Sequence, residues 1–173
     1  FDLRRVPFSE SLRETAAWWG SLPELRPMPV PASAFDPVYS TWYSYHHGIS
    51  AEAVEQEVKS GLEFGMRTVI VDDGWQKIGR TGSYPGTGDW LESDRFPDMK
   101  HHVRRVREKG VRYLLWVALP FAGEESRIFP ELKDKLLYFS GALRTWILDP
   151  RFPEVREYLV STCVRLVKEW ELD

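Results

Sequence analysis

Apolar stretches and helical spacings alternate along the chain from residue 38 onward. Three stretches rich in β-branched and aromatic residues predict strands: "VYSTWYSY" (38–45), "RTVIVDD" (67–73) and "VRYLLWVALP" (111–120). The second is almost wholly apolar before its acids, which is typical of a parallel strand buried on both faces. A shorter strand-like piece, "RTWILDP" (144–150), follows later in the chain.

Between these strands, apolar residues recur at the spacing of amphipathic helices. The first predicted helix begins after Ser50, a good N-cap, and ends at Gly65. The second ends at Gly110, the third begins at Pro153, and residues 121–144 are expected to form a long loop with some helix. The predicted buried positions are Val54, Val58 and Leu62, then Met99, Val103 and Val106, then Val155, Leu159, Cys163, Leu166 and Trp170.

Strand and helix in alternation are typical of βαβ units, which build either an open doubly wound sheet or a barrel. A dinucleotide-binding sheet would place a glycine fingerprint after the first strand, and "WYSYHHGIS" does not supply one. Long loops after the second and third strands favour a (β/α)8 barrel, which builds its active site from such loops. The fold class is therefore predicted as α/β: a partial (β/α)8 TIM barrel of about the first three βα units, since a whole barrel needs about 250 residues.

Residues 1–37 have a different character. "SESLRETAAWWGSLP" (9–23) predicts a short helix with Ser9 or Ser11 as its cap and Gly20 as its stop, and a proline-rich extended stretch follows. We therefore place a boundary near residue 37, with a connector over 1–37 and the barrel portion over 38–173. The chain starts without a methionine and ends at "EWELD", so we expect a fragment of a longer protein.

Charge and composition narrow the possible partners. The net charge of the 173 residues is −3 and no basic stripe appears, so nucleic acid and anionic membranes are not expected as partners. The longest apolar run is far shorter than the roughly 20 residues that cross a bilayer. The single cysteine, Cys163, excludes an internal disulfide framework and suits a reducing compartment, so a cytoplasmic location is expected.

Two adjacent acids, Asp72 and Asp73, end the second predicted strand. The plain interpretation is a turn, because Asp-Gly is a strong hairpin signal, but the residues after it do not alternate as a return strand would. The functional interpretation is that both carboxylates accept hydrogen bonds from a ligand rich in hydroxyls. A divalent metal is a third possibility, although the neighbouring acids Asp89, Glu92 and Asp94 lack the spacing of a metal-binding loop.

Tryptophan is the unusual feature of the composition, with eight among 173 residues. Core packing is the default for any one of them, but flat apolar rings with a polar edge also stack on sugars. Trp42, Trp75, Trp90 and Trp116 lie in or just after the predicted strands, where a barrel would gather them at one mouth. The pair His46 and His47 is weak support for zinc, and Glu124 and Glu125 are expected on a loop surface.

The order and spacing of five motifs resemble glycoside hydrolase family 36, the bacterial α-galactosidases or melibiases. The motifs are "YSTWYSY", "VIVDDGWQ", "GDWLESDRFPDMK", "GVRYLLWVALPF" and "LRTWILDPRFPEVREYL". This resemblance covers the chain from about residue 38 to its end. It implies a (β/α)8 catalytic barrel preceded by a β-sandwich domain, so that residues 1–37 would connect the two.

The resemblance also implies roles for particular residues. Asp72 and Asp73 match the acids that bind the hydroxyls at C4 and C6 of galactose, and Trp116 matches an indole that packs on the sugar. Trp42 resembles a wall of the same pocket, and Trp90 matches the family's "GDW" without a clear role. One departure is "ALPFAGEES", where many members have an acidic "EPE" after the third strand.

A retaining α-galactosidase is therefore the expected activity of the parent protein. The family's nucleophile follows the fourth strand in a Lys-x-Asp pattern and its acid/base lies on the sixth, so both are expected after Asp173 and none within this chain, which should be inactive alone. No cofactor or metal is expected; the expected partners are galactose-containing oligosaccharides and a second copy in a homo-oligomer. The alternatives are an α-N-acetylgalactosaminidase, raffinose-type galactosyl transfer, and a sugar-binding barrel without catalysis.

Overall fold

The computed structural model describes residues 3–80 and 84–173 and divides the chain into two units, Phe1–Phe35 and Asp36–Asp173. The first unit contains helix α1 (Phe8–Ser21) and two short 3-10 turns, η1 (Pro23–Leu25) and η2 (Ala32–Phe35). The helix follows Pro7 as its N-cap, so Ser9 and Ser11 lie inside its first turns and the predicted serine cap is wrong. It also continues one residue past Gly20, the predicted stop.

The second unit is built on a parallel sheet. Its strands are β1 (Val38–Ser40), β2 (Thr68–Val71) and β3 (Arg112–Leu115), in the order β1-β2-β3. Both pairings of β2 are parallel, which confirms the predicted order of strands and shows that the hairpin interpretation of "DG" is wrong. The strand predicted over 38–45 ends early, because residues Trp42–Tyr45 form the short helix α2, followed by the 3-10 turn η3 (His46–Gly48).

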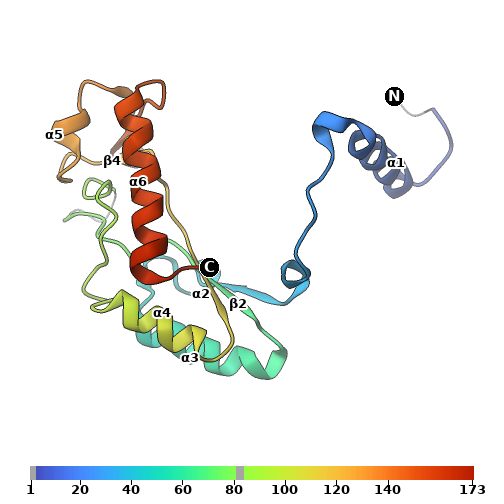
Figure 1. The fold of residues 1–173 in the computed structure, drawn as a ribbon, viewed down its shortest axis with the longest axis horizontal. Helices are drawn as coiled ribbons and strands as arrows, with labels where there is room; N and C mark the ends of the chain where they lie inside the picture. Colours follow the sequence, from blue (N-terminus) through green and yellow to red (C-terminus); the bar gives the residue numbers. More distant parts are fainter. Residues whose placement is uncertain (1–2, 81–83) are drawn as a thin grey trace. The chain divides into compact units, whose positions relative to one another are not determined.

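Helices α3 (Ala51–Gly61) and α4 (Met99–Arg107) cover one face of this sheet (Figure 1). Ser50 caps α3 as predicted, since its hydroxyl accepts a hydrogen bond from the amide of Ala53 at 3.2 Å. A 3-10 turn, η4 (Leu62–Phe64), lengthens the helix to Gly65, whose φ of +78° explains why glycine stands there. Asp98 caps α4 in the same way through the amide of His101.

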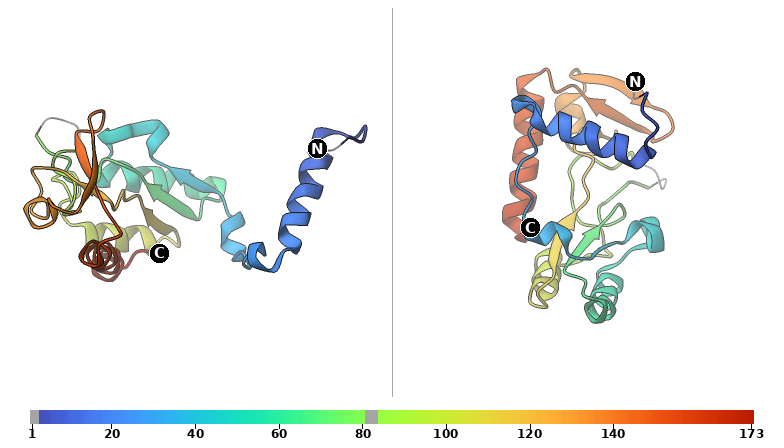
Figure 2. Two further views of the ribbon diagram at one scale, coloured as in Figure 1. Left: turned by 90° about the horizontal axis from the view of Figure 1, so that it is seen from above. Right: turned by 90° about the vertical axis from the view of Figure 1, so that its right-hand side faces the viewer.

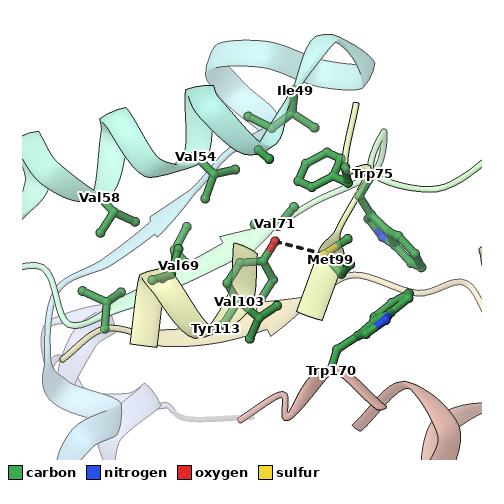
Figure 3. Close-up of a cluster of buried hydrophobic side chains, with 14 of the residues drawn as sticks. Ile49, Val54, Val58, Val69, Val71, Trp75, Met99, Val103, Tyr113 and Trp170 are labelled. Carbon is green, nitrogen blue, oxygen red and sulfur yellow. Dashed lines mark hydrogen bonds between the residues drawn. The ribbon is translucent and has the colours of Figure 1, made fainter. Parts of the chain in front are cut away.

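The core lies between the sheet and these helices, as the close-up of its side chains shows (Figure 3). Val69 and Val71 of β2 and Tyr113 of β3 are fully buried there, because alternate residues of a strand point to one face. Leu114 belongs to the opposite face and remains 37% exposed. The helix residues predicted from spacing are among those buried: Val54, Val58, Met99, Val103 and Val106.

A second, antiparallel sheet follows β3. It contains β4 (Phe121–Ala122), β5 (Leu136–Ser140) and β6 (Thr145–Leu148) in the order β4-β6-β5, with the short helix α5 (Phe129–Leu132) after β4. The sequence predicted only β6 of these strands. β4 is too short to show a period, and β5 leaves Leu137, Tyr138 and Phe139 largely exposed, so the apolar alternation of a half-buried strand is missing.

The long helix α6 (Pro153–Trp170) runs from the antiparallel sheet to helix α4 (Figures 1 and 2). It begins at Pro153, as predicted, because a proline loses no helical hydrogen bond at the first position. Its buried residues are Val155, Thr162, Leu166 and Trp170. Cys163 is exposed, so the predicted stripe is wrong at that position. Within the described part of the chain, no helix is long and apolar enough to cross a membrane.

A buried histidine links the two helices that cover the parallel sheet. The ring of His102 on α4 is 1% exposed, and its Nδ1 lies 2.8 Å from Oε1 of Glu55 on α3. A carboxylate only accepts hydrogen bonds, so Nδ1 carries the proton and Nε2 can accept from the Tyr113 hydroxyl at 3.1 Å. Burial lowers the pKa of His102, and this effect outweighs the opposite effect of Glu55.

The pKa of Glu55, the carboxylate bonded to His102, is lowered as well. Burial raises the pKa of Glu55, but the hydrogen bonds from Arg105 and His102 outweigh it and leave the pKa below its ordinary value. Both groups therefore favour folding when deprotonated. Their contribution is complete above the unfolded pKa of the histidine, about 6.5, and is lost as the pH falls through the folded values.

We expect His102→Gln to flatten the pH dependence of stability. In the unsubstituted chain, the free energy of unfolding should fall between pH 7.5 and pH 5, because the unfolded state takes up the proton that buried His102 resists. Urea unfolding at several pH values measures this slope. His46→Gln, at an exposed position on the turn after β1, is the control and should change the slope less than His102→Gln does. Equal slopes for the unsubstituted chain and His102→Gln would contradict this role.

Candidate functional site

Three candidate residues follow the C-terminal ends of the parallel strands: Trp42 after β1, Asp72 after β2 and Trp116 after β3. Ser40 pairs with Ile70, and Leu115 pairs with Val71. Trp42 and Asp72 each come two residues after the members of the first pair. Asp72 and Trp116 each come one residue after the members of the second pair. The strand order therefore puts Asp72 after the central strand, with Trp116 directly after β3 on one side and Trp42, in helix α2, after β1 on the other.

Asp72 keeps part of its carboxylate open. Its amide donates to Oγ1 of Thr41 at 3.0 Å, which fixes the chain against the end of β1. Its Oδ1 accepts from the amide of Asp73 at 2.8 Å, and Oδ2 makes no hydrogen bond to the residues that the structure describes. The side chain is only partly buried. An ionised carboxylate with a free oxygen can accept hydrogen bonds from hydroxyl groups of a ligand.

Asp73 is buried and its carboxylate is occupied by protein groups. The residue is 2% exposed. Oδ1 accepts from Nε2 of Gln76 at 2.6 Å, and Oδ2 lies 2.8 Å from Nε2 of His47 and accepts from the hydroxyl of Tyr84. Three donors compensate the cost of burying this charge. Asp73 therefore joins the turn after β1, the start of the loop after β2, and the more distant part of that loop.

Aromatic rings surround this carboxylate. The ring of His47 lies edge-to-face with Trp42 at 5.6 Å and with Tyr84 at 6.0 Å, and Tyr84 in turn contacts Phe121 at 5.4 Å. Burial raises the pKa of Tyr84, and the hydrogen bond to Asp73 raises it further. The phenol therefore stays protonated at neutral pH and acts as a donor to Asp73.

Gly74 is required by the close approach of two chain segments. Its φ is +117°, and a Cβ placed there would lie 2.8 Å from Cα of His47. Its amide donates to Oε1 of Gln76 at 3.1 Å, and its carbonyl accepts from Arg95 at 2.9 Å. The glycine after the two acids thus allows His47 to reach Asp73, and its turn bends the chain without reversing it into a hairpin.

A chain of indoles lies beside Asp72. Trp116 donates its amide to the carbonyl of Val71 at 2.9 Å, and its own carbonyl accepts from Nε1 of Trp75 at 2.8 Å. The ring of Trp116 is half-buried and meets the ring of Trp90 at 6.2 Å, whereas Trp75 and Trp90 are almost fully buried. Trp116 is therefore the indole of these three that a ligand can reach, and Trp90 is covered by protein atoms.

The structure brings together Trp42, Asp72, Asp73 and Trp116 at one sheet edge, and it sets Trp90 behind Trp116. Sequence reasoning did not identify Gln76 or Tyr84, and it considered His47 only as a zinc ligand. A polar Gln beside the acids was a weak signal for Gln76, and no signal in the sequence marked Tyr84. Glu124 and Glu125 are exposed, as expected. Residues 81–83 of the loop before Tyr84 lie outside the described residues.

These features define an α/β domain with an acidic, tryptophan-lined site at the ends of its parallel strands. The chain belongs to the Melibiase family, whose model matches residues 33–173. The match includes the whole parallel sheet, both acids and all four candidate tryptophans.

Two curated relatives share 24% and 29% sequence identity with this chain. "Alpha-galactosidase 2" of Pediococcus pentosaceus is 24% identical over 143 residues, which are 79% of this chain and 20% of that protein. "Myogenesis-regulating glycosidase" of Mus musculus is 29% identical over 158 residues, 82% of this chain and 21% of that protein. The chain thus spans about a fifth of the length of these relatives.

Solved structures share the fold. The α-galactosidase from Thermus thermophilus, in complex with p-nitrophenyl α-D-galactopyranoside, matches with a TM-score of 0.68 and 26% identity. That match covers 86% of this chain and 31% of the other. The GH36 α-galactosidase from Geobacillus stearothermophilus matches with a TM-score of 0.70 and 21% identity, over 79% of this chain and 20% of the other. The α/β fold of this chain is therefore similar to that of GH36 α-galactosidases.

We expect Gly74→Ala to destabilise the chain by more than about 2 kcal/mol, because a residue with a Cβ resists this φ and the new carbon would overlap the backbone of His47. Gly48→Ala is the matched control, since nothing lies within 4 Å of a Cβ placed at Gly48. The control should change the free energy of unfolding by no more than about 1 kcal/mol. Urea unfolding of both variants measures the difference, and similar values for the two would contradict the close approach at Gly74.

Proposed function

We propose that the protein containing this chain is a retaining α-galactosidase, which hydrolyses terminal α-galactosyl residues of oligosaccharides. The observation that carries the proposal is the partly open carboxylate of Asp72 between Trp42 and Trp116, in a chain of the Melibiase family. Support comes from relatives named as α-galactosidases and from a Thermus thermophilus structure with a bound α-galactoside. Another structure of that enzyme contains stachyose.

We also propose that the parallel sheet is the first part of a (β/α)8 barrel. The edge of β3 that faces away from β2 supports this proposal. There Tyr113 donates its amide to Oδ2 of Asp173 at 3.0 Å, and its carbonyl accepts from the amide of Asp173 at 3.2 Å. Backbone that follows α6 is thus already bonded beside β3, where the next strand of a barrel would lie.

Recognition of galactose follows from the chemistry of the site. Asp72 accepts hydrogen bonds from sugar hydroxyls, and an ionised acceptor strengthens such bonds. The indoles of Trp42 and Trp116 offer apolar faces to the C–H face of the pyranose. Asp73 holds His47 and Tyr84 in place. Its carboxylate can bond a sugar hydroxyl directly only if the Tyr84 hydroxyl moves away from Oδ2.

Retaining hydrolysis needs two further carboxyls about 5–5.5 Å apart, one to attack C1 and one to protonate the leaving oxygen. We assign neither role to Asp72 or Asp73: both oxygens of buried Asp73 are bonded to protein groups, and Asp72 is assigned to recognition of the sugar hydroxyls. The nucleophile and the acid/base are proposed to lie outside residues 1–173. The alternatives are a glycosidase that prefers N-acetylgalactosamine, a galactosyl transferase and a non-catalytic barrel. Turnover of p-nitrophenyl α-galactoside in water supports the hydrolase. Turnover only of the N-acetylgalactosaminide, turnover only with a sugar acceptor, or galactose binding without turnover would each support one of the alternatives instead.

We expect Asp72→Asn in the full-length protein to lower kcat/KM for p-nitrophenyl α-galactoside at least about tenfold, because hydrogen bonds to charged groups contribute about 1.5–3 kcal/mol each. Asp73→Asn should lower it too, and should also lower the melting temperature, since an amide nitrogen would face the donors of His47 or Gln76. Asp94→Asn, an exposed acid of the same loop, is the control. Unchanged kinetics in Asp72→Asn would remove Asp72 from the site.

We expect Trp116→Ala to reduce galactose affinity about tenfold while changing the melting temperature less than Trp75→Ala does. Trp75 is 0% exposed, and truncation of a buried tryptophan costs roughly 3–5 kcal/mol. Trp116 is half-buried at the end of its strand, so its removal leaves an open space rather than a sealed cavity. Galactose titration and thermal melting of both variants provide the comparison. A large loss of stability in Trp116→Ala with galactose binding intact would make Trp116 a core residue.

A further inference from the structure

The motif Gly88-Asp89-Trp90 joins the loop after β2 to two other parts of the chain. The carboxylate of Asp89 accepts hydrogen bonds from the amides of Arg127 at 2.9 Å and Ile128 at 3.1 Å, at the start of α5. Because a carboxylate satisfies free amides at a helix start, Asp89 fixes the insertion after β3 to this loop.

Helix α6 holds the backbone of the same motif. The hydroxyl of Tyr158 donates to the carbonyl of Gly88. Nη2 of Arg165 donates to the carbonyl of Asp89 at 2.9 Å and to that of Trp90 at 3.1 Å. Tyr158 and Arg165 lie about two turns apart on one face of the helix, so α6 presents both to the motif.

Trp90 is held in a conformation that is unfavourable by itself. Its φ is +51°, a left-handed value that non-glycine residues seldom adopt. Its indole is 1% exposed, and Nε1 has no hydrogen-bond partner among the residues that the structure describes. Both features destabilise the motif, and the hydrogen bonds from Arg165 and Tyr158 offset part of that cost.

In this conformation, the ring of Trp90 packs against the ring of Trp116. The ring of Trp90 lies 6.2 Å from that of Trp116 and 6.3 Å from that of Trp75. Helix α6 also supports Trp116 through Trp75. Trp170 of α6 packs edge-to-face on Trp75 at 5.5 Å (Figure 3), and Trp75 donates to the carbonyl of Trp116. Both the ring and the backbone of Trp116 are thus fixed from α6.

We propose that Arg165 is a positioning residue for the sugar-stacking face of Trp116, acting through the backbone of Trp90. This inference rests on the proposed function, because it takes Trp116 as a wall of the galactose site. Arg165 acts from the outer helix α6 and needs no contact with the sugar. A planar guanidinium can serve two carbonyls at once, which a lysine ammonium does with poorer geometry.

The chain offers a matched control on the same helix. Arg156 also donates to two backbone carbonyls, those of Pro150 and Arg151, each at 2.8 Å. These carbonyls belong to the turn before α6. Among the described residues, no hydrogen bond or ring contact links that turn to Trp75, Trp90, Trp116 or Trp170. Arg165→Met and Arg156→Met therefore remove the same kind of interaction, and only the first removes it from Trp90.

The experiment measures galactose affinity, KM and kcat for p-nitrophenyl α-galactoside, and melting temperature in the full-length protein. Arg165→Met should weaken galactose binding and raise KM about tenfold with a smaller change in kcat, since displacement of a binding group by a distant substitution is costly. Arg165→Lys should recover part of the loss. Arg156→Met should leave affinity and KM unchanged, whatever its effect on melting temperature.

Four outcomes decide between a positioning role and a purely structural role for Arg165, and between the inference and the proposed function. If Arg165→Met and Arg156→Met both lower the melting temperature and neither changes galactose affinity, the inference is wrong and Arg165 is structural. If Arg165→Met does not fold, Arg165→Lys decides, because the inference requires it to weaken binding and unchanged binding would overturn it. If Trp116→Ala loses galactose while both Arg165 variants keep it, the inference alone fails; if the unsubstituted protein neither binds nor hydrolyses α-galactosides, the proposed function fails with it.

Discussion

A buried carboxylate in need of donors organises the end of the parallel sheet. Asp73 follows directly after a buried strand, and its charge would be costly there without partners. Gln76 supplies a donor from the same turn, and His47 and Tyr84 supply donors from separate loops. Meeting this one requirement fixes the turn after β1, explains the glycine at position 74, and leaves Asp72 as the acid with an open oxygen.

The other side of the site depends on helix packing. Trp116 has its backbone bonded to β2 and to Trp75, and its ring lies against Trp90. Trp75 and Trp90 are in turn held by α6, through a ring contact from Trp170 and hydrogen bonds from Arg165. The insertion after β3 packs on the first half of α6 through a small core of Ala122, Leu132, Leu148 and Val155, so its antiparallel sheet helps to hold that helix.

Periodicity in the sequence was enough to predict the elements that bury a regular stripe. The three parallel strands, Ser50 as a cap and Pro153 as a helix start are local features, and each is present in the structure. β4 and β5 were not predictable in this way, because one is very short and the other is largely exposed. Cys163 and Thr162 show the limit of the method, since a stripe can shift by one position when a helix is packed from two sides.

The position of the acids could be predicted from sequence, but their different environments could not. His47 is 26 residues before Asp73 and Tyr84 is 11 residues after it, and no local pattern connects them. The direct test of the account is a crystal structure of the full-length protein with bound galactose. We expect sugar hydroxyls within hydrogen-bond distance of Asp72, and the pyranose stacked on Trp116 or Trp42. Galactose bound elsewhere, with Asp72 exposed only to solvent, would contradict the account.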